Sequence, residues 1–213
     1  MASNARAEAA QAPDWFGAAA RDIAPFPVIM SGYAIFYAVW WPFAWGWAGA
    51  GAFLVVVAAA AFLVIRGVAQ IRHAALFPNN PTPEIEGERK AMTMLNSITH
   101  PLYMFPSILL LVLGQGRWVL PLMVFVIGAH FVPMARILGR KIDYLLGPVT
   151  MIAAILAGVL ALEEHVSWLI VFAVAGVGGT VSTLSYAIYL AADYHLLCAR
   201  AGERRDVAPL PRT

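Results

Sequence analysis

The stretch AGAGAFLVVVAAAAFLVI, residues 48–65, contains no charged side chain and is followed directly by Arg66. A helix needs roughly 20 apolar residues to cross about 30 Å of hydrocarbon. Lipid offers no hydrogen-bond partner, so the backbone amides of such a stretch must be satisfied within their own segment, as they are in a helix. Residues 48–70 are therefore predicted to form a membrane-spanning helix.

Five further apolar runs predict a polytopic chain. Of the 213 residues, 61% are hydrophobic and only 12% are charged, and the mean hydropathy is +0.73. A soluble domain carries more charge than this. We therefore expect an all-α transmembrane bundle of six helices, at residues 25–46, 48–70, 97–115, 118–138, 142–162 and 166–192. Short turns after the first, third and fifth runs predict three helical hairpins within residues 25–199.

Basic residues predict the orientation of these hairpins. Of the 14 lysines and arginines, only Arg117 falls in a turn within a hairpin. The positive-inside rule then places both ends and the segments that join the hairpins in the cytoplasm. Tryptophan prefers the membrane–water interface, and all tryptophans except Trp15 lie near the opposite ends of the runs: Trp40, Trp41, Trp45, Trp47, Trp118 and Trp168. We expect a multi-pass protein of a bacterial inner (plasma) membrane.

The segments outside the runs are predicted to be cytoplasmic. In the N-terminal tail, 1–24, residues 1–13 are expected to be disordered and Asp14 to cap a short interfacial helix. Prolines break the inner loop 72–96, and the acids after them favour a helix that continues into the third run. Residues 200–213 form a basic tail. The net charge of +2 comes from this inner rim, and it suits anionic lipid head groups and gives no case for nucleic acid.

Small residues recur at heptad spacing in the last two runs. Such stripes allow close helix contact in lipid, where no hydrophobic force draws helices together. We expect the stripes to face each other or a shared neighbour: Asp143, Gly147, Thr150, Ala154, Ala157 and Ala161, and Ala175, Gly179, Ser182, Tyr186, Tyr189 and Asp193. Either close helix contact or a ligand against the backbone would explain the glycines at 176, 178 and 179. Stripes of this kind also allow a homo-oligomer.

His130 is the deepest ionisable residue of the runs, because no aspartate, glutamate, lysine or arginine falls at the middle of any run. Its imidazole either bonds a neighbouring helix or belongs to a binding site. Asp143 begins the fifth run and is either part of the same site or an ion pair at the rim. We expect a cytoplasm-facing pocket above a basic rim, with these ligand-binding residues: His130, His100, Tyr186, Tyr189, Asp193, Tyr33 and Tyr37.

Catalytic and metal-binding patterns are absent from the sequence. It has no His-Glu-x-x-His arrangement, no nucleotide-binding glycine loop and a single cysteine, Cys198. Ser182 and Ser185 have no base nearby in the sequence to activate them. These absences favour a protein without catalytic activity, metal ion or other cofactor. An enzyme that acts on lipid is a third alternative, and it would need a pocket open sideways to the bilayer.

The run Gly128-Ala-His-Phe-Val-Pro-Met-Ala135 is similar to a Gly-x-His-Phe-x-Pro-x-Ala signature of small bacterial multi-pass inner-membrane proteins. The resemblance covers the fourth run and its inner end, and it implies no particular chemistry. Two main hypotheses therefore follow from the residues themselves. The first is binding or transport of a small molecule or lipid through the pocket around His130. The second is a structural or regulatory membrane subunit that uses its small-residue faces for packing or oligomerisation.

Overall fold

The described residues of this computed structural model, 12–202, are α-helical apart from short connections and one 3-10 turn, and contain no strand. The elements are α2 (Phe16–Ile23), α3 (Phe26–Ala38), α4 (Trp41–Ala74), α5 (Pro83–Val112), the 3-10 turn η1 (Gly116–Trp118), α6 (Val119–Leu138), α7 (Asp143–Leu162) and α8 (Trp168–Arg200). Five segments are long and apolar enough to cross a membrane: α4, α5, η1 with α6, α7, and α8. The all-α class and the membrane-like character are confirmed. The predicted disorder of residues 1–13 and the basic tail lie largely outside the described residues.

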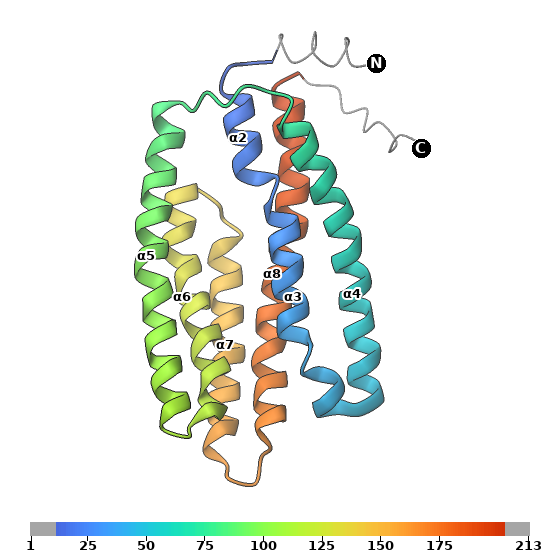
Figure 1. Cartoon of the computed structure of the whole chain (residues 1–213), viewed down its shortest axis with the longest axis vertical. Helices are drawn as coiled ribbons and strands as arrows, with labels where there is room; N and C mark the ends of the chain where they lie inside the picture. The colour runs from blue at the N-terminus through green and yellow to red at the C-terminus, as the bar shows by residue number, and fades with distance from the viewer. Residues whose placement is uncertain (1–11, 203–213) are drawn as a thin grey trace.

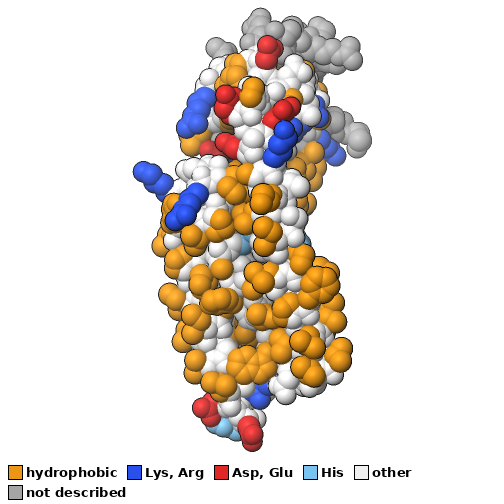
Figure 2. All heavy atoms as spheres, turned by 90° about the vertical axis from the view of Figure 1, so that its left-hand side faces the viewer, with side chains coloured by type: hydrophobic (Ala, Val, Ile, Leu, Met, Phe, Trp, Pro, Cys, Tyr) orange, Lys and Arg blue, Asp and Glu red, His pale blue; other side chains and the backbone are white. Residues whose placement is uncertain are grey.

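The long helices run side by side along the long axis of the molecule (Figure 1). The connections after α3, α5 and α7 lie at one end, which we call the turn end, and α2 with the connection 78–82 lies at the other, the α2 end. Hydrophobic side chains cover a broad band of the surface in Figure 2, whereas charged side chains gather toward the α2 end and at the tip of the turn end. A band of this kind suits contact with lipid.

The first predicted span, 25–46, is not one continuous helix. α3 has 13 residues, or about 20 Å of helix, and the chain turns at residues 39–40 before α4 begins. Pro42 lies in the first turn of α4, where its missing amide proton costs nothing. Gly46 then bends α4, with φ 57° and ψ −133°. The predicted boundary at residue 47 lies one residue from this bend. The earlier turn at residues 39–40 was not predicted, because apolar side chains continue through it and hydropathy does not mark it.

The predicted inner loop, 72–96, is mostly helical. Residues 72–74 belong to α4 and residues 83–96 to α5. The Thr82 hydroxyl oxygen accepts a hydrogen bond from the Ile85 amide at 3.4 Å, and Pro83 and Glu84 follow in the first turn. The predicted continuation of this helix into the third run is confirmed. The predicted run 97–115 placed His100 near the start of a helix. Because α5 begins at Pro83, His100 lies inside the helix instead.

The two small-residue stripes are used for packing within the chain. All six stripe residues of α7 are buried, and the Thr150 hydroxyl bonds the Ser182 hydroxyl of α8. A Cβ atom built on Gly147 would lie 2.9 Å from the carbonyl oxygen of Gly128 on α6. The α7 stripe therefore faces both its predicted partner, α8, and a second neighbour, α6.

α8 is the central helix of the bundle and packs against α2, α3, α4, α6 and α7. Its glycines let α3 approach closely. A Cβ atom on Gly176 would lie 2.3 Å from the Tyr37 carbonyl oxygen, and one on Gly179 would lie 2.5 Å from the Tyr37 ring. Close helix contact, one of the two explanations considered for these glycines, therefore accounts for both positions.

α2 completes the bundle at the α2 end. Phe16 is fully buried, and its ring centroid lies 4.6 Å from that of Phe77. Arg89 of α5 forms a salt bridge with Asp22 at 2.9 Å. The predicted short helix is therefore present, but it packs against protein. Asp14 is not its cap, because Trp15 occupies that position and no side chain bonds the first amides.

Candidate functional site

The predicted ligand-binding residues fall into three groups in the structure. His130 and His100 lie at the contact between α5 and α6. Tyr33 and Tyr37 belong to α3, where Tyr37 is buried against α8 and Tyr33 is exposed. Tyr186, Tyr189 and Asp193 lie on α8 toward the α2 end. No single described cavity is lined by all three groups.

His130 takes part in a hydrogen bond between two helices. Its Nδ1 lies 2.9 Å from the hydroxyl oxygen of Thr99 on α5, and that hydroxyl also lies 2.9 Å from the Leu95 carbonyl oxygen. A hydroxyl has one proton. If Thr99 donates to the carbonyl, it accepts from His130, whose Nδ1 then carries a proton. This geometry matches the simpler of the two explanations considered for His130, a bond to a neighbouring helix.

His100 lies near His130 but points to its own helix. Its Nδ1 donates to the Asn96 carbonyl oxygen at 2.8 Å, one turn earlier in α5. Tyr33 and Tyr103 lie within electrostatic range of the buried Tyr37. The main role that the geometry gives Tyr37 is to fill the space beside the α8 glycines.

Residues of the α6–α7 connection, α7 and α8 form a further polar group, which we call the Asp143 cluster: Arg140, Asp143, Tyr186 and Tyr189. Arg140 Nη1 donates to the Tyr186 hydroxyl at 2.6 Å, and the Arg140 guanidinium lies 5.9 Å from the centre of the Tyr186 ring. Tyr189 lies within electrostatic range of Arg140, Asp143 and Asp193.

Asp143 is the unusual member of this cluster. Its side chain is 0% exposed, and neither carboxylate oxygen has a hydrogen-bond partner. A rim ion pair, one of the two explanations considered for Asp143, is not formed with Arg140, because no Arg140 nitrogen lies within salt-bridge distance and the guanidinium is bonded to Tyr186. A buried carboxylate without a donor or a cation is costly, so it must bind a proton or a positive group.

The local sequence explains how Asp143 comes to this position. Gly139 ends α6 with a φ of 64°, a left-handed conformation that glycine adopts without strain. The chain turns through residues 140–142, and Asp143 is the first residue of α7. The same turn brings Arg140 over Tyr186 of α8. Phe131 and Phe26 contact the Tyr186 ring, with centroids at 5.8 and 6.0 Å.

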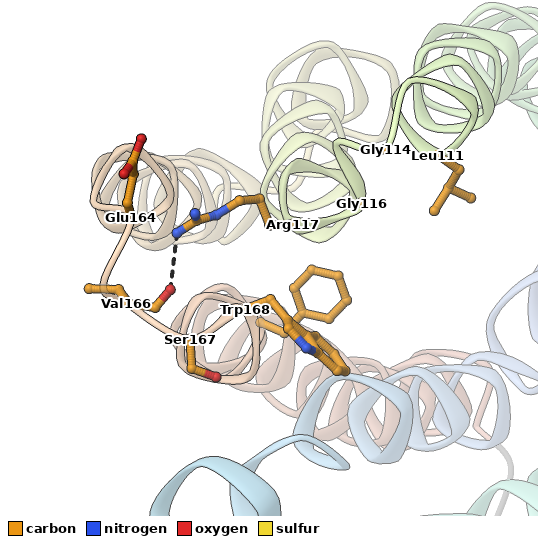
Figure 3. Close-up of a pocket in the computed structure, with 9 residues that line it drawn as sticks. Leu111, Gly114, Gly116, Arg117, Glu164, Val166, Ser167 and Trp168 are labelled. Carbon is orange, nitrogen blue, oxygen red and sulfur yellow. Dashed lines mark hydrogen bonds between the residues drawn. The ribbon is translucent and has the colours of Figure 1, made fainter.

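A cavity of about 650 Å³ lies at the turn end (Figure 3), lined by Leu111, Gly114, Gly116, Arg117, Glu164, Val166, Ser167, Trp168 and Phe172. Its one basic side chain is already engaged. Arg117 Nη2 donates to the carbonyl oxygens of Glu163 at 2.9 Å, Val166 at 3.1 Å and Leu160 at 3.4 Å. These bonds satisfy carbonyl groups at the end of α7 and in the turn after it. The cavity is therefore a weaker candidate for a charged ligand than the Asp143 cluster.

No group of three or more His, Cys, Asp or Glu side chains in the described part of the chain could hold a metal ion. The Asp143 cluster offers one carboxylate and one guanidinium, and a guanidinium does not bind metal. Comparison of the chain with protein families, curated proteins and solved structures gives no match.

The sequence signal for Asp143 was its place at the start of a small-residue stripe. That position predicted contact with other helices, and the contact is the cause of its burial. The sequence did not indicate where the Arg140 side chain points. Arg140 lies three residues before Asp143, and its guanidinium bonds Tyr186.

Proposed function

We propose that this chain is a multi-pass inner-membrane protein that binds a small organic cation at the Asp143 cluster. We further propose that α3–α4, α5–α6 and α7–α8 form three membrane hairpins with both ends of the chain in the cytoplasm. The orientation is supported by the basic residues of the α2 end, which include Arg21, Arg72, Arg89, Lys90 and Arg200. By the positive-inside rule such an end faces the cytoplasm.

The observation that carries the binding proposal is the buried, unpartnered carboxylate of Asp143. An ammonium group would supply the positive charge and the hydrogen-bond donors that this carboxylate lacks. The neighbouring rings of Tyr186 and Phe131 favour an organic cation in particular, because the face of an aromatic ring attracts positive charge. A carboxylate together with aromatic faces is a common way to bind an amine.

Arg140 occupies the place that such a ligand would take. Its guanidinium lies over the Tyr186 ring, as a bound cation would. It is carried by the short connection between α6 and α7, which follows Gly139. Entry of a ligand requires Arg140 to leave this position, after which the ligand cation contacts both Tyr186 and Asp143. We propose binding and not transport, because neither described cavity is lined by the cluster or joins it to the turn end.

The alternative of a structural or regulatory subunit depended on small-residue faces that another chain could use. In the described chain the α7 face is covered by α6 and α8, and the α8 glycines are covered by α3. These stripes therefore give no specific support to a contact with a second copy. No other feature of the described residues favours this alternative over binding.

Thermal unfolding of the full chain in detergent tests the binding proposal. Methylammonium, tetramethylammonium and choline chlorides are each compared with sodium chloride at the same ionic strength. We expect at least one organic cation to raise Tm, because a ligand that binds only the folded state stabilises it by mass action. The rise should disappear in Asp143→Asn and persist in Glu164→Gln, which removes an exposed acid at the turn end.

Without ligand, Asp143→Asn should be more stable than the natural chain, by about 1–3 kcal/mol, because it removes an unpaired buried charge. Loss of binding together with a gain in stability distinguishes a ligand site from a structural contact. The proposal fails if none of the three cations shifts Tm, or if Asp143→Asn lowers the stability of the unliganded protein.

A further inference from the structure

A second cavity, of about 410 Å³, lies between α4 and α8. Each helix contributes residues at helical spacing from one face, namely Ala59, Phe62, Leu63 and Arg66 from α4 and Ile188, Ala191, Ala192 and His195 from α8. Phe62, Ile188 and Ala192 are exposed. We call this cavity the α4–α8 groove. It is apolar along its length, opens on the outer surface of the bundle and has its two polar residues at one end.

The polar end of the groove carries an arginine without an acidic partner. Arg66 Nη2 lies 2.6 Å from His195 Nε2, and no described carboxylate lies within salt-bridge distance of Arg66. Arginine is always protonated and can only donate, so His195 Nε2 accepts and this imidazole is neutral. The contact fixes the guanidinium and leaves its other N–H donors for an anion. Arg66 therefore carries a full positive charge at the mouth of an apolar groove.

The depth of Arg66 in the bundle matches the position of a lipid headgroup. From Gly46, where α4 bends at the turn end, to Arg66 is about 30 Å of helix at 1.5 Å per residue. This length equals the hydrocarbon thickness of a typical bilayer, about 30 Å. If Gly46 lies at one boundary of the hydrocarbon, Arg66 lies at the other. The apolar part of the groove, from Arg66 back to Ala59, then lies within the acyl chains.

Polar contacts hold the two helices together beside the polar end of the groove. Gln70 Nε2 donates to the Ala191 carbonyl oxygen at 3.1 Å, and the Tyr194 hydroxyl donates to the Gln70 carbonyl oxygen at 3.2 Å. Figure 1 shows α4 and α8 meeting toward the α2 end and separating toward the turn end. The two helices are therefore held together near Arg66 and diverge toward the turn end, which leaves room between them for an acyl chain.

We infer that the α4–α8 groove binds an anionic phospholipid of the leaflet at the α2 end. The lipid phosphate accepts hydrogen bonds from Arg66, and one acyl chain lies between Ala59 and Ala192 on the two helices. Charge complementarity favours an anionic headgroup over a zwitterionic one. The groove has a cation, Arg66, for the phosphate but no acidic side chain for the positive group of a zwitterionic lipid. An acyl chain fits between the helices because the side chains there are small, namely Ala59, Ala191 and Ala192. The site is independent of the Asp143 cluster.

Native mass spectrometry of the full chain tests this site. The protein is titrated in detergent with phosphatidylglycerol or with phosphatidylcholine of the same acyl chains. We expect one tightly bound phosphatidylglycerol and weaker binding of phosphatidylcholine. Arg66→Gln should weaken phosphatidylglycerol binding by about tenfold, the value of one charge-assisted contact. Arg72→Gln, which removes an exposed arginine from the next turns of α4, is the matched control and should change binding less than twofold.

Ala192→Trp tests the acyl-chain part separately, because it fills the groove without a change of charge. It should weaken both lipids, and it carries the test if Arg66→Gln proves unstable. Inorganic phosphate at the same concentration should not displace the lipid, since it lacks the chain. The inference is overturned if Arg66→Gln and Arg72→Gln weaken binding equally, if Ala192→Trp has no effect, or if inorganic phosphate competes fully.

Discussion

Arg117 illustrates how a single residue can depart from the charge pattern of a membrane protein without changing its fold. Between the helices at the turn end, it is the only lysine or arginine. A cation on that side would ordinarily oppose the predicted orientation. Arg117, however, donates to three backbone carbonyl oxygens, one in the last turn of α7 and two in the α7–α8 connection. Its side chain acts as a cap for the end of α7, where cations interact favourably with the helix dipole.

Arg117→Gln should lower the free energy of unfolding by about 1–3 kcal/mol, because carbonyl oxygens lose a charged donor. Arg117→Lys should recover only part of this loss, since an ammonium group cannot reproduce the planar fork of a guanidinium. Thermal unfolding in detergent measures both changes. Arg136→Gln, at an exposed arginine at the end of α6, is the control and should have little effect. Equal destabilisation by the two glutamine variants would contradict the capping role.

At this scale the sequence ranked His130 above Asp143, and the structure reverses the order. His130 stood out because it lies deep within an apolar run, yet its imidazole is satisfied by Thr99. Asp143 was considered either as part of the same site or as an ion pair at the rim, and Arg140 is the nearest basic residue in the sequence apart from Lys141. The pairing fails because Arg140 bonds Tyr186, which lies 46 residues later. Nothing local in the sequence reports a competition between two partners that far apart.

At the scale of elements, α3 and α8 pack closely because glycines of α8 have no side chain to keep the two backbones apart. A Cβ atom on Gly176 would lie 2.3 Å from the backbone of α3, which cannot move away as a flexible side chain could. Gly51 of α4 is a matched control, because a Cβ atom there would meet nothing within 4 Å. Both glycines lie inside long helices.

Gly176→Ala should therefore destabilise the protein by about 1–3 kcal/mol, the cost of overpacking a close contact. Gly51→Ala should be neutral or stabilising by about 0.5–1 kcal/mol, because alanine is the better helix former. Comparison of the two variants by thermal unfolding checks the contact. If Gly176→Ala were as stable as Gly51→Ala, the α3–α8 contact would not be as close as the structure has it.

The ends of α6 and α7 agree closely with the predicted runs, whereas α8 continues eight residues past the run 166–192 and the turn between α3 and α4 was not predicted. α6 and α7 start and stop within one residue of the runs 118–138 and 142–162. Charged or glycine-rich turns bound those runs, so hydropathy marks their ends. Between α3 and α4 the turn is itself built from tryptophan and other apolar residues. The hydropathy of the sequence does not change at this turn, and only Pro42 and Gly46 indicate that the chain changes direction.

At the scale of the whole molecule, the proposed orientation can be tested with introduced cysteines in a Cys198→Ala background. Asn79→Cys lies in the exposed connection at the α2 end, and Glu164→Cys lies in the exposed connection at the turn end. In intact cells a membrane-impermeant maleimide should label Glu164→Cys and not Asn79→Cys, because only the turn end faces outward. After the cells are opened, both should react. Labelling of Asn79→Cys in intact cells would reverse the orientation.

The central place of α8 has a consequence for the synthesis of this protein. Ribosomes make a chain from its N-terminus, so α8 is the last of the described helices to enter the membrane, although α2, α3, α4, α6 and α7 all pack against it. Until then the glycine-lined contact for Tyr37 and the partner of Thr150 do not exist. The earlier helices must insert one by one and wait in lipid as a loose assembly. Newly made chains should therefore be most vulnerable to quality-control proteases in the interval before α8 is inserted.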